Sequence, residues 1–193
     1  MHHIYHTEGI ILDSTSSGEA GKRYSIFTRD LGMITAVASG VRKMSSKLRF
    51  ILQDFAYLKI DLVAGKNILR VTSASKTNQL EQLTKNPKTF RVIANISRLL
   101  KRLLAGVEPN EALFMDLVNG LAILEKAETE EDLKNIEAIM VLRMLNNLGY
   151  IGENDVLQNL TKSPFEQGLI FKVSKDRNNV LREINRALKE THL

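Results

Sequence analysis

The sequence contains no cysteine and no tryptophan, and only three of its 193 residues are prolines. Without cysteine, the chain cannot form a disulfide framework or a cysteine-ligated zinc site. Its apolar runs are far shorter than the roughly 18 residues that suggest a membrane span. Its N-terminal segment also lacks the basic and apolar stretches of a secretory signal. We therefore expect a cytoplasmic protein that does not enter a membrane.

Histidine is scarce as well, with only four in the chain: His2, His3, His6 and His192. Three of them fall in a segment predicted to be extended, where they cannot form the i, i+4 metal pair of a helix. No histidine lies in the body of the chain to activate a nucleophile. Residues 18–22 lack the spacing of a phosphate-binding loop, and Arg23 stands where its hydroxyl residue belongs. The sequence therefore predicts no enzyme, no metal and no cofactor.

Positive charge is concentrated in the first part of the chain. Residues 1–80 contain eleven Lys and Arg against six Asp and Glu, whereas residues 81–193 contain sixteen of each sign. The whole net charge of +5 therefore belongs to the first part. A basic part joined to a neutral part indicates one region that meets a polyanion and another region with a different task. The chain is long enough for two small domains.

The first part has the pattern of short strands separated by turns. We expect strands at residues 9–14, 24–28, 33–41, 55–63 and 68–73. In the fourth of these, Leu58, Ile60 and Leu62 recur at every second position, so one face of the strand should be buried. Five short strands with unequal loops suit a closed barrel of the OB type, and an SH3-like barrel is the alternative.

Beyond residue 79 the apolar period changes from two to 3.6, which indicates helices. Asn86 and Pro87 predict a helix start, and that helix should end at Gly106. Further helices are expected at about 109–125, from Thr129 to Gly149, and at 176–191. Residues 150–174 should be irregular, with a short strand at 169–173. The predicted fold class is α+β, with a five-stranded OB-type barrel in residues 1–80 and a helical domain in residues 81–193.

Seven cations lie between residues 18 and 49, with only Glu19 and Asp30 as opposing charges. A single cation in a loop commonly serves solubility alone. Seven together, close to Gly40 and two consecutive serines, indicate a surface that binds the phosphates of a nucleic acid. The candidate binding residues are Lys22, Arg23, Arg29, Arg42, Lys43, Lys47 and Arg49.

Aromatic residues and a second basic stripe accompany this segment. Tyr24, Phe50, Phe55 and Tyr57 lie close to the cations, and any of them could stack on a base. At strand spacing an aromatic residue is more often part of a core, and only Tyr57 falls opposite the apolar stripe, so it is kept as the stacking candidate. Residues 88, 91, 95, 98 and 102 form a polar, mostly basic stripe on the first helix. It is interpreted as a solvated face, with a second binding surface as the alternative.

Residues 19–62 and 68–74 resemble the N-terminal domain of RecO, a family of bacterial recombination mediators. Residues 142–151 and 186–193 resemble helices of the same family. Many members carry a four-cysteine zinc ribbon, but Val156 and Leu157 stand where the first cysteine is expected, so zinc is not expected here. The matching positions of the N-terminal pattern are Glu19, Phe27, Thr28, Gly32, Gly40, Arg42, Lys43, Ser46, Leu52, Gln53 and Phe55.

The resemblance implies an OB barrel followed by a helical domain, in agreement with the periodicity. It also implies binding of single- and double-stranded DNA and annealing of complementary strands. The resemblance further implies that the protein acts together with RecR to load recombinase onto DNA that is coated with single-strand-binding protein. The acidic tail of single-strand-binding protein is an implied partner, and the resemblance assigns no site for it. The residues alone leave two alternatives open: a protein-docking adaptor without DNA contact, and an RNA-binding barrel.

Overall fold

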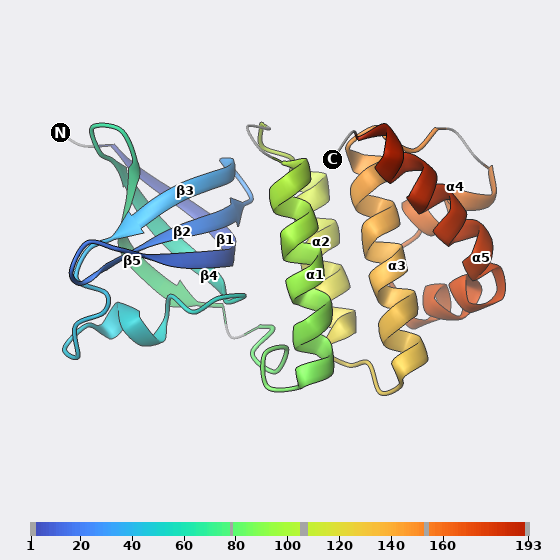
Figure 1. Cartoon of the computed structure of the whole chain (residues 1–193), viewed down its shortest axis with the longest axis horizontal. Coiled ribbons are helices and arrows are strands. Elements are labelled where there is room, and N and C mark those ends of the chain that lie inside the picture. The colour runs from blue at the N-terminus through green and yellow to red at the C-terminus, as the bar shows by residue number, and fades with distance from the viewer. Residues whose placement is uncertain (1–2, 78, 105–107, 153–154, 192–193) are drawn as a thin grey trace. The chain divides into compact units, whose positions relative to one another are not determined.

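The computed structural model describes residues 3–77, 79–104, 108–152 and 155–191. Within these ranges the chain forms five strands, one short 3-10 helix and five α-helices (Figure 1). All five predicted strands are confirmed. The strands are β1 (Ile4–Ser17), β2 (Gly21–Thr28), β3 (Gly32–Ala38), β4 (Tyr57–Ala64) and β5 (Leu69–Lys76), with η1 (Lys47–Phe50) between β3 and β4. The helices are α1 (Pro87–Leu103), α2 (Glu111–Leu124), α3 (Glu130–Asn147), α4 (Asp155–Lys162) and α5 (Gln167–Glu190).

The strands form a closed barrel in the order β1-β2-β3-β5-β4. Strand β1 pairs antiparallel with both β2 and β4, and β3 pairs with β5 in parallel. Because β1 has 14 residues, its first half can pair with β4 and its second half with β2. A register shift between Ile11 and Asp13 interrupts its pairing with β2. This is the predicted OB arrangement, and the pairing of β3 with β5 that closes it joins Ala36 to Leu69 and Val37 to Arg70.

Alternating strand residues fill the interior of the barrel. Leu58, Ile60 and Leu62 are at most 1% exposed, which confirms the predicted buried face of β4. Val41 and Leu52, from the segment between β3 and β4, belong to the same core. The core therefore holds part of this connecting segment as well as the strands.

The chain divides into two compact units. The first comprises Met1–Glu81 and Ser97–Glu111, and the second comprises Gln82–Ile96 and Ala112–Leu193. Residues of α1 are thus shared between the two units. The predicted division into functional domains after residue 80 stays a prediction.

The helix boundaries predicted at Asn86, Thr129 and Gly149 have the expected capping contacts, whereas the helix end predicted at Gly106 lies outside the described residues. At the start of α1, the backbone N–H of Lys88 donates to Asn86 Oδ1 at 2.9 Å. Thr129 and Asp132 form a reciprocal capping box at the start of α3. After α3, Gly149 has a φ of 80°, and the next backbone N–H donates to the Leu145 carbonyl oxygen. These contacts satisfy backbone groups that a helix end leaves without partners.

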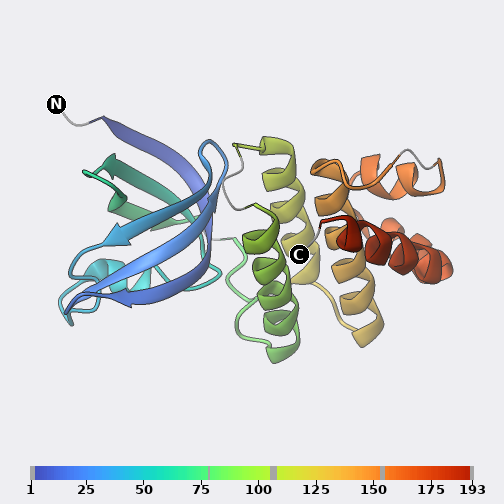
Figure 2. The same cartoon turned by 45° about the horizontal axis from the view of Figure 1, so that its top comes forward.

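Helix α3 packs against α4 and α5, and both views show α5 beside it (Figures 1 and 2). Arg143 of α3 is buried and holds several segments together. Its Nε donates to the Leu160 carbonyl oxygen at 2.9 Å, and its Nη1 donates to Asp116 Oδ1 at 2.9 Å. Its Nη2 donates to the carbonyl oxygen of Ser163. One side chain therefore ties α2, α4 and the segment after α4 to α3.

Residues 150–174 were predicted to be irregular with a strand at 169–173, and that prediction is wrong. The segment contains α4 and the first turns of α5. Leu169, Ile170 and Val173 are all buried, and they share one helical face. A strand would have pointed the neighbours Leu169 and Ile170 to opposite sides. The kink at Asp176, where φ is −124° and ψ is 23°, coincides with the predicted start of the last helix.

Candidate nucleic-acid interface

The turn between β1 and β2 and the loop after β3 lie at the same end of the barrel. Lys22, near the start of β2, lies opposite Ala38 at the end of β3. The backbone N–H of Arg42 donates to the carbonyl oxygen of Ala20 at 2.9 Å. This hydrogen bond joins the two connections, so the cations that they carry are held close to one another.

The loop between β3 and β4 is anchored on the barrel core at two points. Val41 and Leu52 are 2% and 1% exposed. Gly40 turns the chain just before the first anchor, with a φ of 67° that side-chain-bearing residues rarely adopt. The loop is therefore fixed at both ends of the stretch that carries its cations, which are Arg42, Lys43, Lys47 and Arg49.

Six of the seven predicted binding residues lie at this end of the barrel, where Figure 1 shows η1 beside the β1–β2 turn. We call them the basic loop surface: Lys22, Arg23, Arg42, Lys43, Lys47 and Arg49. Across the described ranges, none of the six forms an ion pair with a carboxylate. Lys22 Nζ donates instead to Ser14 Oγ at 3.2 Å. Their charge is therefore not neutralised by a direct carboxylate contact.

Arg29 does not belong to the basic loop surface. It follows the far end of β2, and the eight residues of that strand span roughly 23 Å at about 3.3 Å per residue. Its guanidinium also forms an ion pair with Glu111, and the hydrogen bond to that carboxylate raises the pKa of Arg29 above its ordinary value. The structure thus does not bring Arg29 together with the other six, and its contact with nucleic acid stays a prediction.

Tyr57 is not available for stacking on a base, so that expectation is wrong. It is 7% exposed, and its hydroxyl donates to Glu8 Oε2 at 2.6 Å. Burial and this hydrogen bond hold the pKa of Tyr57 well above its ordinary value. Tyr24 and Phe55 are also buried, at 0% and 9%. These three aromatic residues are therefore largely withdrawn from solvent, and Tyr24 belongs to the barrel core.

Phe50 is the exposed aromatic residue beside the cations. It is 68% exposed, and the Arg49 guanidinium lies 5.8 Å from the centre of its ring. Met44, in the same loop, is 84% exposed. Strand periodicity could not single out Phe50, because it lies at the end of η1 rather than in a strand. The sequence signal that could have indicated its exposure is its place directly after Arg49 and two residues before the buried anchor Leu52.

The polar stripe of α1 is neither wholly solvated nor a free cationic surface. Lys88 and Arg91 both pair with Glu130 of α3, at 2.8 and 3.7 Å. The hydrogen bond from Lys88 lowers the pKa of Glu130. Asn95 Nδ2 donates to Glu137 at 3.0 Å. This part of the stripe therefore connects α1 to α3.

Two further features bear on the chemistry of the described part of the chain. It contains no helix that is both long and apolar enough to cross a membrane. In those same residues, no three or more His, Cys, Asp or Glu side chains are grouped so that they could hold a metal ion. His6, one of the histidines considered as a possible metal ligand, contacts Asp61, with 2.7 Å between Nδ1 and Oδ1.

Comparison with known proteins gives two family matches that together cover most of the sequence. Residues 1–80 match the model described as "Recombination protein O N terminal", and residues 85–153 match "Recombination protein O C terminal". A protein named "DNA repair protein RecO" from Heliobacterium modesticaldum is 31% identical over 78% of this chain and 53% of its own length. One of the same name from Thermodesulfovibrio yellowstonii is 29% identical over 76% of this chain and 58% of its own. The chain thus spans a little more than half the length of these relatives.

Proposed function

Because the chain belongs to the RecO family of DNA repair proteins, we propose that it is a non-catalytic recombination mediator whose barrel binds single- and double-stranded DNA. The observation that carries this proposal is the basic loop surface, with six cations at one end of the barrel and no carboxylate paired to them in the described ranges. Such a surface binds the phosphate backbone independently of base sequence. The proposed place of action is the cytoplasm.

Annealing of complementary strands follows from the same surface. Two strands repel each other through their phosphates, and cations that bind several phosphates reduce this repulsion. Contacts that do not depend on sequence also allow the strands to shift until their bases pair. The basic loop surface thus supplies what annealing requires without a catalytic group or a cofactor.

Phe50 adds a means of distinguishing single strands from duplexes. An exposed aromatic ring can stack on an unpaired base, whereas a base within a duplex is already stacked on its neighbours. The ring of Phe50 is exposed beside the Arg49 guanidinium, so a backbone bound by the cations would bring a base close to it. We assign to Phe50 the stacking role for which Tyr57 was considered.

The partners in this proposal come from family membership. They are RecR and the acidic tail of single-strand-binding protein, and the proposed outcome is the loading of recombinase onto coated DNA. Complementary oligonucleotides precoated with single-strand-binding protein test the function directly. The protein should accelerate their annealing, less so when the coat lacks its acidic tail. Adding RecR should then increase recombinase loading on the same substrates.

A charge-reversal variant separates this function from its alternatives. The variant Arg42→Glu, Lys43→Glu, Lys47→Glu and Arg49→Glu should lose binding to labelled single-stranded DNA, while its circular dichroism spectrum is unchanged. If neither protein binds DNA, the chain is a docking adaptor instead. If the natural sequence prefers RNA to DNA of equal length, it is an RNA-binding module.

A further inference from the structure

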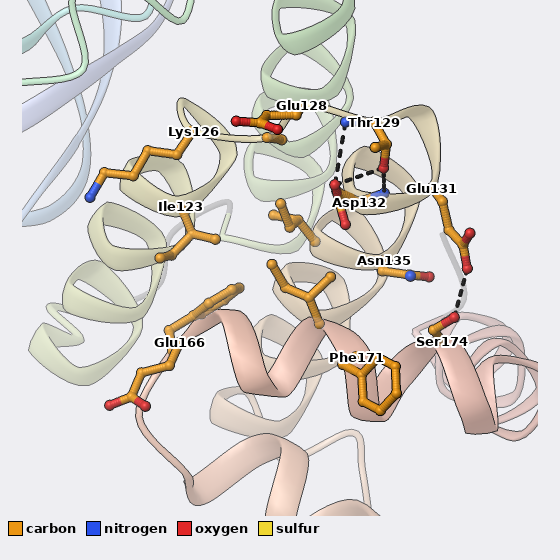
Figure 3. Close-up of a pocket in the computed structure, with 14 residues that line it drawn as sticks. Ile123, Lys126, Glu128, Thr129, Glu131, Asp132, Asn135, Glu166, Phe171 and Ser174 are labelled. Atoms are coloured by element: carbon orange, nitrogen blue, oxygen red, sulfur yellow. Dashed lines mark hydrogen bonds between the residues drawn. The ribbon is translucent and has the colours of Figure 1, made fainter.

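The second compact unit contains a pocket of about 690 Å³. Its lining comes from the end of α2, the connection to α3, the first turns of α3 and the beginning of α5 (Figure 3). Three lining residues are apolar and buried: Phe165, Ile136 and Ile170 are 9%, 0% and 7% exposed. A pocket with this lining suits a branched aliphatic or aromatic side chain.

Phe171 forms an exposed part of the same lining. It lies on α5 and is 64% exposed, although most large apolar side chains of the second unit are buried. The Lys175 ammonium lies 4.7 Å from the centre of its ring. The ring therefore accepts a cation, and an arginine or lysine of a ligand would take this position by displacing Lys175.

Asn135 contributes a polar group that lacks a partner. It is 1% exposed, and its Oδ1 accepts no hydrogen bond from any described residue. A buried amide oxygen without a donor is unfavourable, because it has lost its hydrogen bonds to water. A ligand that brings an N–H donor to this side of the pocket would relieve that cost.

The charges around the pocket are mainly negative. Four carboxylates contribute to the lining, against Lys126, which extends away from the cluster in Figure 3, and Lys175, whose ammonium lies at the ring of Phe171. Glu131 accepts a hydrogen bond from Ser174 Oγ at 2.6 Å, and Asp132 is held in the capping box of α3. The pocket therefore favours a cationic ligand and opposes an acidic one. The four carboxylates are those of Glu128, Glu131, Asp132 and Glu166.

We propose that this pocket binds a short basic segment of a protein partner. An apolar side chain of the segment enters between Ile136 and Ile170, and a backbone N–H donates to Asn135. A neighbouring arginine or lysine lies near Phe171 and the carboxylates. This interaction is independent of the proposed DNA binding, which relies on the opposite sign of charge.

Three labelled peptides test the proposal by fluorescence anisotropy with the full chain. The first has a leucine and a tryptophan between two arginines; the second has glutamates in place of the arginines; the third has serines in place of the apolar residues. Only the first should bind saturably. On its addition, the side-chain amide signals of Asn135 should shift in nitrogen-15 NMR spectra.

Two variants and one control locate the site. Phe171→Ala should weaken binding of the arginine peptide about tenfold, as expected for an aromatic contact at the centre of an interface. Glu128→Lys combined with Glu131→Lys should weaken that peptide and strengthen the glutamate peptide. Leu181→Ala, on the same helix but outside the pocket lining, should change neither. The proposal fails if the arginine peptide does not bind, if the glutamate peptide binds more tightly, or if Phe171→Ala has no effect.

Discussion

Neutralising the loop cations should flatten the salt dependence of single-strand binding. The perturbation is Arg42→Ala, Lys43→Ala, Lys47→Ala and Arg49→Ala in one protein, which leaves two cations of the basic loop surface. Each phosphate contact contributes about −0.7 to the log–log slope, so six contacts give about −4 and two give about −1.4. A fourfold rise in salt should therefore weaken the natural protein about 300-fold and the variant only about sevenfold.

The assay is fluorescence anisotropy of a labelled deoxythymidine oligonucleotide, titrated with protein at several salt concentrations. The matched control is Lys134→Ala, Lys162→Ala, Lys172→Ala and Lys189→Ala, which removes the same charge from exposed positions of the second unit. Its slope should equal that of the natural protein. Parallel slopes for the natural protein and the loop variant would refute the assignment of the phosphate contacts to this loop.

Three further substitutions test single contacts. Phe50→Ala should weaken single-strand binding about tenfold but leave duplex binding unchanged, since stacking one base is worth about 1–3 kcal/mol; equal losses on both substrates would contradict the role. Tyr24→Phe should keep or raise the thermal unfolding midpoint, because the buried hydroxyl has no hydrogen-bond partner among the described residues. Burial raises the pKa of Tyr24 from 10.0 to about 12. The folded state therefore favours the neutral phenol, and this contribution to stability is complete below pH 10.0 and is lost as the pH rises through about 12. In urea titrations across that range, Tyr24→Phe should therefore lose less stability than the natural protein. Arg143→Ala should lower the free energy of unfolding by about 3 kcal/mol in the same assay, because it leaves Asp116 without its cation.

The barrel could be predicted because its signals are local. Alternation in β4 identified the buried face, and the turn residues separated the strands. The pairing of β3 with β5 in parallel is not a local property, since it depends on how the whole sheet closes. Helix ends at Asn86, Thr129 and Gly149 were predictable for the same local reason, as each has its capping residue in the sequence.

Residues 150–174 were harder because short apolar runs fit either type of structure. The run at 169–173 contains Leu169, Ile170 and Val173, which suit a buried strand as well as one face of a helix. Contact with α3 decides in favour of the helix. Ser163 and Pro164 are residue types that favour a turn, and they lie between α4 and α5.

The candidate site was predictable in composition but not in arrangement. Arg29 is only seven residues from Lys22 in the sequence. In the structure the two lie at opposite ends of β2. Alternation assigned Tyr57 to an outer face, but the residue is only 7% exposed, and its hydroxyl donates to Glu8. The pairing partner of Arg29, Glu111, is 82 residues away in the chain. Such contacts depend on the tertiary fold and have no local signature.

The anchoring of the loop at Val41 and Leu52 affects how tightly it can hold a ligand. A flexible loop loses conformational entropy when it binds, and that loss weakens affinity. Here the barrel core already holds both ends of the loop in the folded chain, so the ends need not be ordered when a ligand binds. The cations between the two anchors could therefore be exchanged to retune affinity, with little expected change in the stability of the barrel.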